Sequence, residues 1–222
     1  MPRTARASVG NVCYHVINRG NLRATVFHNK GDYGAFVTLL GQAIERVPMR
    51  ILAYCLMPNH FHLVLWPHGD GDLSCFMQWL LTSHVRRYHR LRETSGHVWQ
   101  GRFKAFPVEG DDHLLTVVRY VERNPLRAGL VERAEAWEWS SAPAFATGPV
   151  PSFLHVGPVS RGEGWRSFVN RPQTAIEQQA LERSLERGTP FGGDKWVRRT
   201  AIRLGLDATL RPRGRPRVEQ TK

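Results

Sequence analysis

Apolar residues alternate with polar ones, or recur every three to four positions, through the first half of the chain. Alternation is typical of β-strands with one buried face, and the longer period is typical of amphipathic helices. We expect the last of these helices to stop before Pro125, because proline lacks the amide hydrogen that a helix interior needs. The predicted elements are strand 12–18, helix 32–46, strand 51–57, strand 60–66, helix 73–91, strand 102–108 and helix 112–123.

The order strand, helix, strand, strand, helix, strand, helix is that of a ferredoxin-like split βαβ fold with an added C-terminal helix. Only Pro58 and Asn59 separate the second and third strands, and so short a link joins antiparallel neighbours. The predicted fold class is therefore α+β. It is a ferredoxin-like sandwich with an antiparallel sheet, an added helix that carries Tyr120, and a small, mostly helical C-terminal region.

Glycine and proline are concentrated in residues 146–164, which predicts a break in the regular elements. We expect a main domain of residues 1–145, a connector of residues 146–172, and a region of residues 173–222 with helices near 174–187 and 194–206. The tail segment Arg211-Pro212-Arg213-Gly214-Arg215-Pro216-Arg217 is too rich in glycine and proline to fold alone. Within it, Arg213-Gly214-Arg215-Pro216 is similar to the core of an AT-hook, a flexible arm that enters a narrow minor groove.

The chain carries 31 Lys and Arg against 19 Asp and Glu, a formal net charge of +12. Such a charge favours an anionic partner, and first of all nucleic acid. All but four of the basic residues are arginines, whose planar groups suit bidentate phosphate contacts; a codon bias of the genome would raise the arginine content equally. Residues 195–222 hold nine of the basic residues and two acidic ones, so we expect the tail to add general DNA affinity.

Three cysteines, without paired spacing, argue against a disulfide framework and against a thiolate zinc site. The N-terminal residues lack the apolar core of a signal peptide. No apolar run approaches the ~18 residues that a membrane span needs. We therefore expect no membrane contact and a location in the bacterial cytoplasm, in association with the nucleoid.

His60 and His62 are two residues apart in a predicted strand, so their side chains point to the same face. Two neighbouring imidazoles can bind one divalent metal ion, although polar positions on a half-buried strand would give the same pattern.

Tyr120 and Asn124 are four residues apart and share a helix face. An amide oxygen beside two imidazoles makes a mixed site suited to Mg²⁺ or Mn²⁺. A tyrosine hydroxyl there could attack a phosphodiester and form a covalent intermediate.

Each of these residues also has an ordinary structural interpretation. Tyr120 borders an apolar stripe and would serve as boundary packing, and Asn124 would cap a turn that begins at Pro125. Tyr88 is the rival nucleophile because it lies among arginines, but it continues the apolar stripe of its helix, which favours packing. Five further histidines have no partner at ligand spacing and are expected to be surface or structural residues: His68, His84, His89, His97 and His113.

Three motifs follow one another along the chain: Met57-Pro58-Asn59-His60-Phe61-His62-Leu63, Trp99-Gln100-Gly101-Arg102-Phe103-Lys104 and Tyr120-Val121-Glu122-Arg123-Asn124-Pro125-Leu126-Arg127-Ala128-Gly129-Leu130. Together they resemble the REP-associated tyrosine transposases, relatives of the single-tyrosine HUH transposases of insertion sequences. The segments Tyr14-His15-Val16 and Arg19-Gly20-Asn21 are also similar to that family. The resemblance covers residues 10–145 well and the tail more loosely.

The resemblance implies that residues 1–145 form an HUH catalytic domain with a divalent metal held by His60 and His62. It implies that Tyr120 forms a 5′-phosphotyrosine with single-stranded DNA and leaves a free 3′-OH. It implies Asn124 as the third metal ligand, although related insertion-sequence enzymes often have Gln there. The implied substrate is single-stranded or hairpin DNA of the repetitive extragenic palindromes.

Basic and aromatic residues interleave at residues 99–104, which suits base stacking with phosphate neutralisation, although an ordinary strand with a polar edge would give the same pattern. Arg119 and Arg123 flank Tyr120 and are expected to supply a positive field to its hydroxyl. The residues expected to contact DNA are Arg19, Asn21, Arg86, Arg87, Trp99, Arg102, Lys104, Arg213, Arg215 and Arg217.

The leading hypothesis is an enzyme that breaks and joins single-stranded DNA through Tyr120. One alternative is a protein that binds palindromic repeats without cleaving them, and another is a metal-dependent hydrolase that activates water at the histidine pair. Intact His60, His62 and Tyr120 argue against the first alternative, because binding alone needs none of them. A covalent protein–DNA adduct would exclude the second. The sequence leaves open whether the chain is a monomer or a homodimer.

Overall fold

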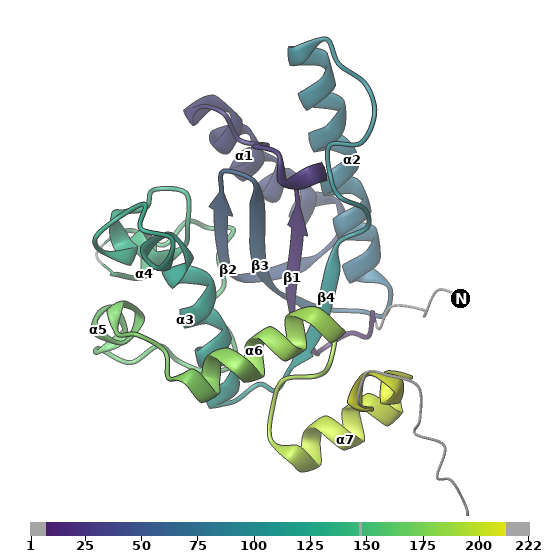
Figure 1. Cartoon of the computed structure of the whole chain (residues 1–222), viewed down its shortest axis with the longest axis vertical. Helices are drawn as coiled ribbons and strands as arrows, with labels where there is room; N and C mark the ends of the chain where they lie inside the picture. Colours follow the sequence, from purple (N-terminus) through teal and green to yellow (C-terminus); the bar gives the residue numbers. More distant parts are fainter. Residues whose placement is uncertain (1–7, 147, 212–222) are drawn as a thin grey trace, which may run out of the picture.

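A four-stranded sheet with helices on both faces forms the centre of the computed structural model, which describes residues 8–146 and 148–211 (Figure 1). The first half contains β1 (Cys13–Arg19), α1 (Lys30–Arg46), β2 (Met49–Met57), β3 (His60–Pro67), α2 (Asp72–Arg92), β4 (Lys104–Val108) and α3 (Asp112–Arg127). The second half contains α4 (Ala142–Ala146), α5 (Trp165–Asn170), α6 (Ala175–Arg187) and α7 (Asp194–Arg203). Three short 3₁₀ turns lie at Asn21–Arg23, Ala134–Ala136 and Asp207–Leu210.

The strands pair in the order β2-β3-β1-β4, and every pair is antiparallel. Because α1 connects β1 to β2 and α2 connects β3 to β4, this is the ferredoxin-like arrangement. The α+β fold class expected from the sequence is confirmed. In the register between β1 and β3, Arg19 lies opposite His60 and Ile17 lies opposite His62.

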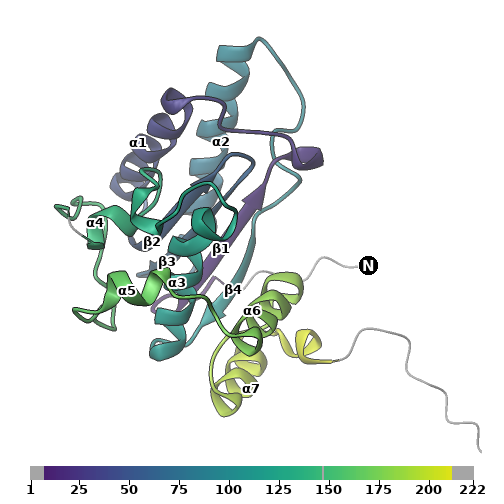
Figure 2. The same cartoon turned by 60° about the vertical axis from the view of Figure 1, so that its left-hand side comes forward.

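Each face of the sheet is buried under its own group of helices. Tyr14 and Phe61 point toward α1 and α2 and join the core on that side. Cys13, Val64 and Phe106 point the other way, into a second core with α3, α5 and α6. Figures 1 and 2 show the two groups of helices on opposite sides of the sheet. Successive strand residues therefore serve different layers, as the alternation in the sequence predicts.

Both edge strands of the sheet pair with segments from the second half of the chain. Along β2, three main-chain hydrogen bonds of 2.8–2.9 Å involve residues of the second half. They join Leu56 to Trp139, Tyr54 to Ser141 and Ile51 to His155. Along β4, the amide of Phe191 donates to the carbonyl of Pro107 at 2.8 Å. The segments that follow α3 thus cover both edges of the sheet as well as one of its faces.

Pro125 does not end α3, so the prediction of a helix end before it was wrong: the helix continues to Arg127. The helix loses only the hydrogen bond that a residue with an amide hydrogen would make at position 125. The next turn is still held, because Ala128 N–H donates to the Asn124 carbonyl and Leu130 N–H donates to the Pro125 carbonyl. Residues 124–127 therefore continue the helix, and their side chains follow the same helical spacing as the residues before Pro125.

The predicted connector, residues 146–172, contains α5, which packs on α3. The α5 residue Trp165 is buried, and its indole donates to the Glu122 carboxylate at 2.9 Å. The same fully buried carboxylate accepts from Ser141 at 2.7 Å and pairs with Arg161 at 3.7 Å. Desolvation raises the pKa of Glu122, and the Arg161 charge and the two hydrogen bonds oppose that rise. The division into catalytic domain, connector and helical region stays a prediction.

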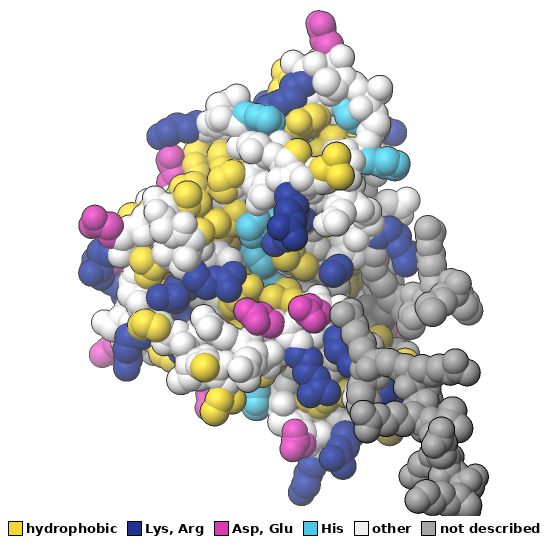
Figure 3. Space-filling model, in the orientation of Figure 1, with side chains coloured by type: hydrophobic (Ala, Val, Ile, Leu, Met, Phe, Trp, Pro, Cys, Tyr) yellow, Lys and Arg dark blue, Asp and Glu magenta, His cyan; other side chains and the backbone are white. Residues whose placement is uncertain are grey.

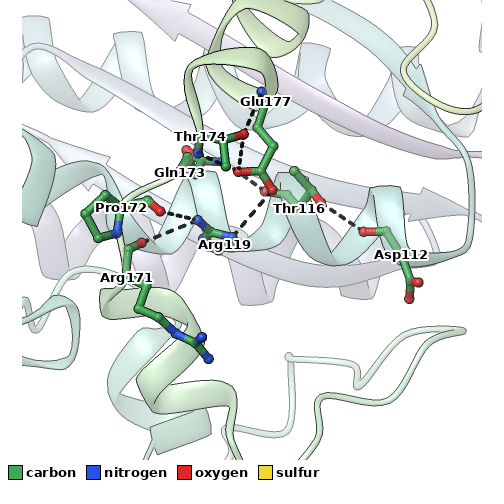
Figure 4. Close-up of polar contacts among 8 residues, drawn as sticks. All are labelled: Asp112, Thr116, Arg119, Arg171, Pro172, Gln173, Thr174 and Glu177. Carbon is green, nitrogen blue, oxygen red and sulfur yellow. Dashed lines mark hydrogen bonds and ion pairs between the residues drawn. The ribbon is translucent and has the colours of Figure 1, made fainter.

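The start of α6 is anchored on α3 (Figure 4). The guanidinium of Arg119, a nearly buried α3 residue, donates to the Pro172 carbonyl at 2.7 Å and pairs with Glu177 at 3.6 Å. Thr174 and Glu177 form a capping box, which satisfies amides in the first turn of α6. No helix among residues 8–146 and 148–211 has the length and apolarity to span a membrane.

Candidate active site

The imidazoles of His60 and His62 lie side by side on β3, with ring centroids 5.0 Å apart. His62 is buried, with 1% of its surface exposed, and His60 is partly exposed. Both rings lie on the α3 side of the sheet, where His62 contacts Tyr120. The structure therefore brings the predicted ligand pair together on one face.

One nitrogen of each ring is already hydrogen-bonded. Nδ1 of His60 lies 2.7 Å from Oδ1 of Asn59, and Nδ1 of His62 lies 2.9 Å from Nε2 of His15. Within the described part of the chain, Nε2 of His60 and Nε2 of His62 have no hydrogen-bond partner. Two imidazole nitrogens without other partners fit a divalent metal ion.

Burial determines the charge of these histidines. Desolvation lowers the pKa of His60 to about 4, and the charges of Arg19 and Arg127 add to this effect. Desolvation also holds the pKa of His62 well below its usual range. Both imidazoles are therefore neutral at physiological pH, and neutral imidazole is the form that binds a metal.

Tyr120 and Asn124 both lie on α3, and Tyr120 faces this pair. The Tyr120 ring centroid is 5.7 Å from that of His62, at an interplanar angle of 86°. The Asn124 side chain is buried, and its amide nitrogen donates to the Tyr120 carbonyl at 3.0 Å. Helical spacing thus places the carboxamide beside the phenol, and the phenol lies next to His62. The assignment of Asn124 as a metal ligand stays a prediction.

Arg127 connects these two α3 side chains. Its guanidinium donates to the Tyr120 hydroxyl and to Oδ1 of Asn124, each at 3.2 Å, and lies 4.9 Å from the centre of the Tyr120 ring. Burial raises the pKa of Tyr120, while the charge and hydrogen bond of Arg127 act to lower it. The sequence pattern does not indicate this residue, because Pro125 predicts a helix end before position 127. A continuous helix places position 127 one turn beyond Asn124.

A cavity of about 460 Å³ opens beside His62 and Tyr120. Figure 3 shows Lys and Arg side chains beside His side chains in the middle of this face, with acidic side chains just below them. Four basic residues line the cavity, and Glu186 of α6 is its one acidic lining residue in the described chain. The lining residues are Ile17, Asn18, Arg19, His62, Gln100, Gly101, Arg102, Lys104, Tyr120, Arg127, Leu185 and Glu186.

The family model described as "Transposase IS200 like" matches residues 8–124, more than half of the chain. The chain belongs to the IS200-like transposase family. A Haemophilus influenzae protein named for the REP-associated tyrosine transposases is 27% identical over 121 residues, which are 50% of this chain and 69% of that protein. The REP-associated tyrosine transposase of Escherichia coli is 24% identical over 144 residues, 60% of this chain and 76% of that protein.

The solved structure of a REP-associated tyrosine transposase bound to a REP hairpin is similar to this IS200-like transposase, with a TM-score of 0.55. The sequences are 20% identical, and the match covers 73% of this chain and 96% of that one. At this identity the likeness shows the fold. The resemblance to REP-associated tyrosine transposases found in the sequence is confirmed by the family match and the relatives.

The arginines expected beside the Tyr120 hydroxyl of this IS200-like transposase are not the ones that act on it. Arg119 was expected to supply a positive field there, but its guanidinium is held by main-chain carbonyls and Glu177 near the start of α6 (Figure 4). The positive charges that lower the pKa of Tyr120 belong to Arg127 and Arg19. Arg119 instead donates to the carbonyls of Arg171 and Pro172. The sequence could not predict this contact, because no local pattern shows that this segment packs against α3.

Other residues expected to contact DNA lie elsewhere in the molecule. Arg86 and Arg87 line a groove between α1 and α2, on the opposite side of the sheet from Tyr120. Trp99 is 6% exposed and packs against Phe61, which favours the alternative of ordinary packing. Asn21 is half-buried in the turn after β1. The tail residues Arg213, Arg215 and Arg217 lie outside the described residues.

Tyr88, the rival nucleophile, lies on α2 and so on the far side of the sheet from the histidine pair. Its hydroxyl is 3.4 Å from Nε2 of His28, and the Arg92 guanidinium lies over its ring at 4.4 Å. This placement favours Tyr120 as the tyrosine that can act with the histidines.

A second group of possible metal ligands lies at the start of α3. Ligand atoms of Glu109, Asp111 and His113 lie within 4.8 Å of one another. Asp111 is exposed, and its carboxylate is hydrogen-bonded to Nδ1 of His113 at 2.8 Å. Acidic groups near the surface are common without an ion, and the hydrogen bond accounts for the closeness of Asp111 and His113.

Proposed function

We propose that this IS200-like transposase is a metal-dependent DNA nuclease and strand transferase of the single-tyrosine HUH type, with Tyr120 as its nucleophile. The observation that carries the proposal is the contact between Tyr120 and the histidine pair on β3: the centroid of its ring lies 5.7 Å from that of His62. The basic lining of the adjoining cavity suits a phosphodiester strand.

His60 and His62 would hold the metal through Nε2, and Asn124 would contribute Oδ1. The Asn124 amide nitrogen donates to the Tyr120 carbonyl, which leaves Oδ1 as the atom for a metal, and that oxygen now accepts from Arg127. We expect Mg²⁺ or Mn²⁺, because a site with imidazole and amide ligands accepts either ion. A bound divalent ion supplies Lewis acidity toward a phosphoryl oxygen.

In the proposed reaction, the Tyr120 hydroxyl loses its proton and its oxygen bonds to a DNA phosphorus. The bond from that phosphorus to the 3′ oxygen breaks, and the 3′ oxygen takes up a proton to become a free 3′-OH. The 5′ phosphate then remains on Tyr120 until a 3′-OH attacks it and rejoins the strand. Arg127, which donates to the hydroxyl at 3.2 Å, stabilises the phenolate at the start and end of this cycle.

The proposed substrate is single-stranded or hairpin DNA of repetitive extragenic palindromes. The names of the relatives and the hairpin in the solved relative support this choice, as does the net charge of +12. Arg19, Arg102 and Lys104 would contact the strand in the cavity, and the tail would add general affinity. Such a function places the protein with the bacterial nucleoid in the cytoplasm.

The test is a denaturing gel of the full chain with a labelled hairpin oligonucleotide and Mg²⁺ or Mn²⁺. We expect a covalent adduct and a free 3′-OH product, with mass spectrometry locating the nucleotide on Tyr120. Tyr120→Phe keeps the ring and removes the hydroxyl, so it should eliminate the adduct and leave hairpin binding intact. Tyr88→Phe is the matched control and should change cleavage by a few-fold at most, because a partly exposed hydroxyl contributes about one hydrogen bond.

Each alternative gives a different result in the same experiment. Cleavage without an adduct would indicate a hydrolase that activates water. Tight binding without cleavage, under either metal, would indicate a binding protein. An adduct that survives in Tyr120→Phe would overturn the assignment of the nucleophile.

A further inference from the structure

His15 of β1 lies directly behind His62, on the side away from the metal-binding nitrogen. Its Nε2 is 2.9 Å from Nδ1 of His62, and each residue is 1% exposed. The ring planes are 11° from parallel, with centroids 5.1 Å apart, so the hydrogen bond runs from the edge of one ring to the edge of the other. No sequence pattern by itself indicates a role for His15.

We propose that His15 is a positioning residue that sets the tautomer of His62 and thereby selects the nitrogen that His62 presents to the metal. The proposal rests on the proposed metal site. A neutral imidazole carries one proton, so one nitrogen of the pair must donate and the other must accept. When Nδ1 of His62 donates, its Nε2 keeps a free lone pair, as a metal ligand requires.

The other end of His15 shows what this arrangement costs. If its Nε2 accepts from His62, its own proton is on Nδ1. That atom is buried and finds no hydrogen-bond partner among the described residues. A buried polar atom without a partner costs stability and calls for a functional explanation. Here we explain the unpartnered Nδ1 of His15 by the role of this ring as the hydrogen-bond partner of His62.

The ring of His15 is fixed in place by its neighbours. Phe106 of β4 contacts it edge-on at a centroid distance of 5.0 Å, and Tyr120 of α3 does so at 6.1 Å. The ring therefore cannot turn freely to exchange its nitrogens. Because His15 touches both His62 and Tyr120, it also sets the spacing between the metal ligand and the nucleophile.

His60 has an equivalent partner, Asn59. Oδ1 of Asn59 accepts from Nδ1 of His60 at 2.7 Å, while Nδ2 of Asn59 donates to the Arg23 carbonyl at 3.1 Å and so fixes the orientation of the amide. His60 is thus held with a free lone pair on Nε2. Asn59 and His15 thus hold the two ligands in the same tautomer, with the proton on Nδ1. This agreement supports a role for the tautomer in metal binding.

The test measures Mn²⁺ affinity of the full chain by isothermal titration calorimetry. His15→Phe keeps an aromatic ring in the pocket and removes the acceptor, so we expect affinity to fall about 10–100-fold. His15→Gln restores an acceptor oxygen and should recover most of that loss. The matched control is His84→Phe: His84 is 4% exposed and also has an unpartnered Nδ1, but it lies in the core formed with α1 and α2. This variant should bind Mn²⁺ as the wild type does.

A second measurement reads the tautomer directly. In wild-type protein with Mg²⁺, ¹⁵N NMR of the histidine rings should find the His62 proton on Nδ1. Equal Mn²⁺ affinity in wild type and His62→Ala would overturn the metal site, and the proposed function with it. If His62→Ala loses the metal while His15→Phe keeps wild-type affinity, only the role of His15 is overturned. An unprotonated Nδ1 on metal-loaded His62 would overturn it as well, even if His15→Phe does not fold.

Discussion

Two opposing effects act on the hydroxyl of Tyr120. Burial raises the pKa of the phenol, and the charge and hydrogen bond of Arg127 limit that rise. A phenol with an ordinary pKa of about 10 is already almost fully protonated at neutral pH. The reactive phenolate is therefore rare, and its abundance depends largely on one arginine.

Replacing Arg127 with Met keeps much of the side-chain volume and removes the charge and the hydrogen bond. The pKa of Tyr120 should rise further, so the phenolate fraction at a given pH below that pKa falls. One pKa unit corresponds to about a tenfold loss in cleavage rate at neutral pH. Because the phenolate recovers as pH rises, the loss should shrink in alkaline buffer. Single-turnover cleavage rates from about pH 6 to about pH 10 would measure this.

The matched control for that experiment is Arg133→Met, since Arg133 is exposed, is paired with Glu135 and does not line the cavity. Its pH–rate profile should coincide with that of the wild type. A uniform loss in Arg127→Met at every pH would show that Arg127 binds the substrate and does not favour the phenolate.

The histidine pair was predictable from the sequence because the two-residue period of a strand is local. Arg127 and His15 were not. The position of Arg127 depends on whether Pro125 ends a helix, and this is decided by hydrogen bonds that form beyond the proline. The contact of His15 with His62 depends on which strands pair and in what register, which no single segment specifies.

At the scale of elements, the position of α3 determines where Tyr120 lies. Its buried Glu122 holds the helix to the later segments through Ser141, Trp165 and Arg161. The strands and first helices follow from local periodicity, which is why their order could be predicted. The packing of α5 could not, because the glycine and proline content of residues 146–172 indicates breaks in regular structure without indicating what the segment covers.

Glu122→Gln keeps the shape of the side chain and removes the charge beside Arg161. The Arg161 guanidinium, whose side chain is 7% exposed, would then lack its ionic partner. Removing one partner of a buried pair should lower the free energy of unfolding by about 3 kcal/mol. Urea unfolding followed by circular dichroism would measure it. The control is Glu45→Gln on the exposed surface of α1, which should stay within about 0.5 kcal/mol; equal stability of both variants would contradict the prediction.

At the scale of the whole molecule, basic residues gather on two sides of the sheet. One group lines the cavity beside Tyr120. The other, Arg86, Arg87 and Arg90, lines a groove of about 740 Å³ between α1 and α2 that has no acidic residue in its lining among the described residues. Within the same described ranges, none of these three arginines forms an ion pair. We expect this groove to contact DNA phosphates.

Changing Arg86, Arg87 and Arg90 together to Gln should weaken hairpin binding and leave cleavage of a short single strand unchanged. The slope of log K against log salt should decrease by about one unit for each phosphate that the protein no longer neutralises. Fluorescence anisotropy at several salt concentrations would measure the slope. Arg133→Gln with Arg166→Gln is the control, because both arginines pair with Glu135. An unchanged slope in the triple variant would rule out the groove as a DNA-binding surface.

The segments along both sheet edges have a consequence for how copies of this chain meet. An open edge strand offers its main chain to another molecule, and such strand addition leads to shared sheets or to aggregation. Here Trp139, Ser141 and His155 already form hydrogen bonds with main-chain groups of β2, and Phe191 does so at β4. In β4, Pro107 also has no amide hydrogen to offer. Two copies therefore cannot fuse their sheets at these positions unless the covering segments first detach.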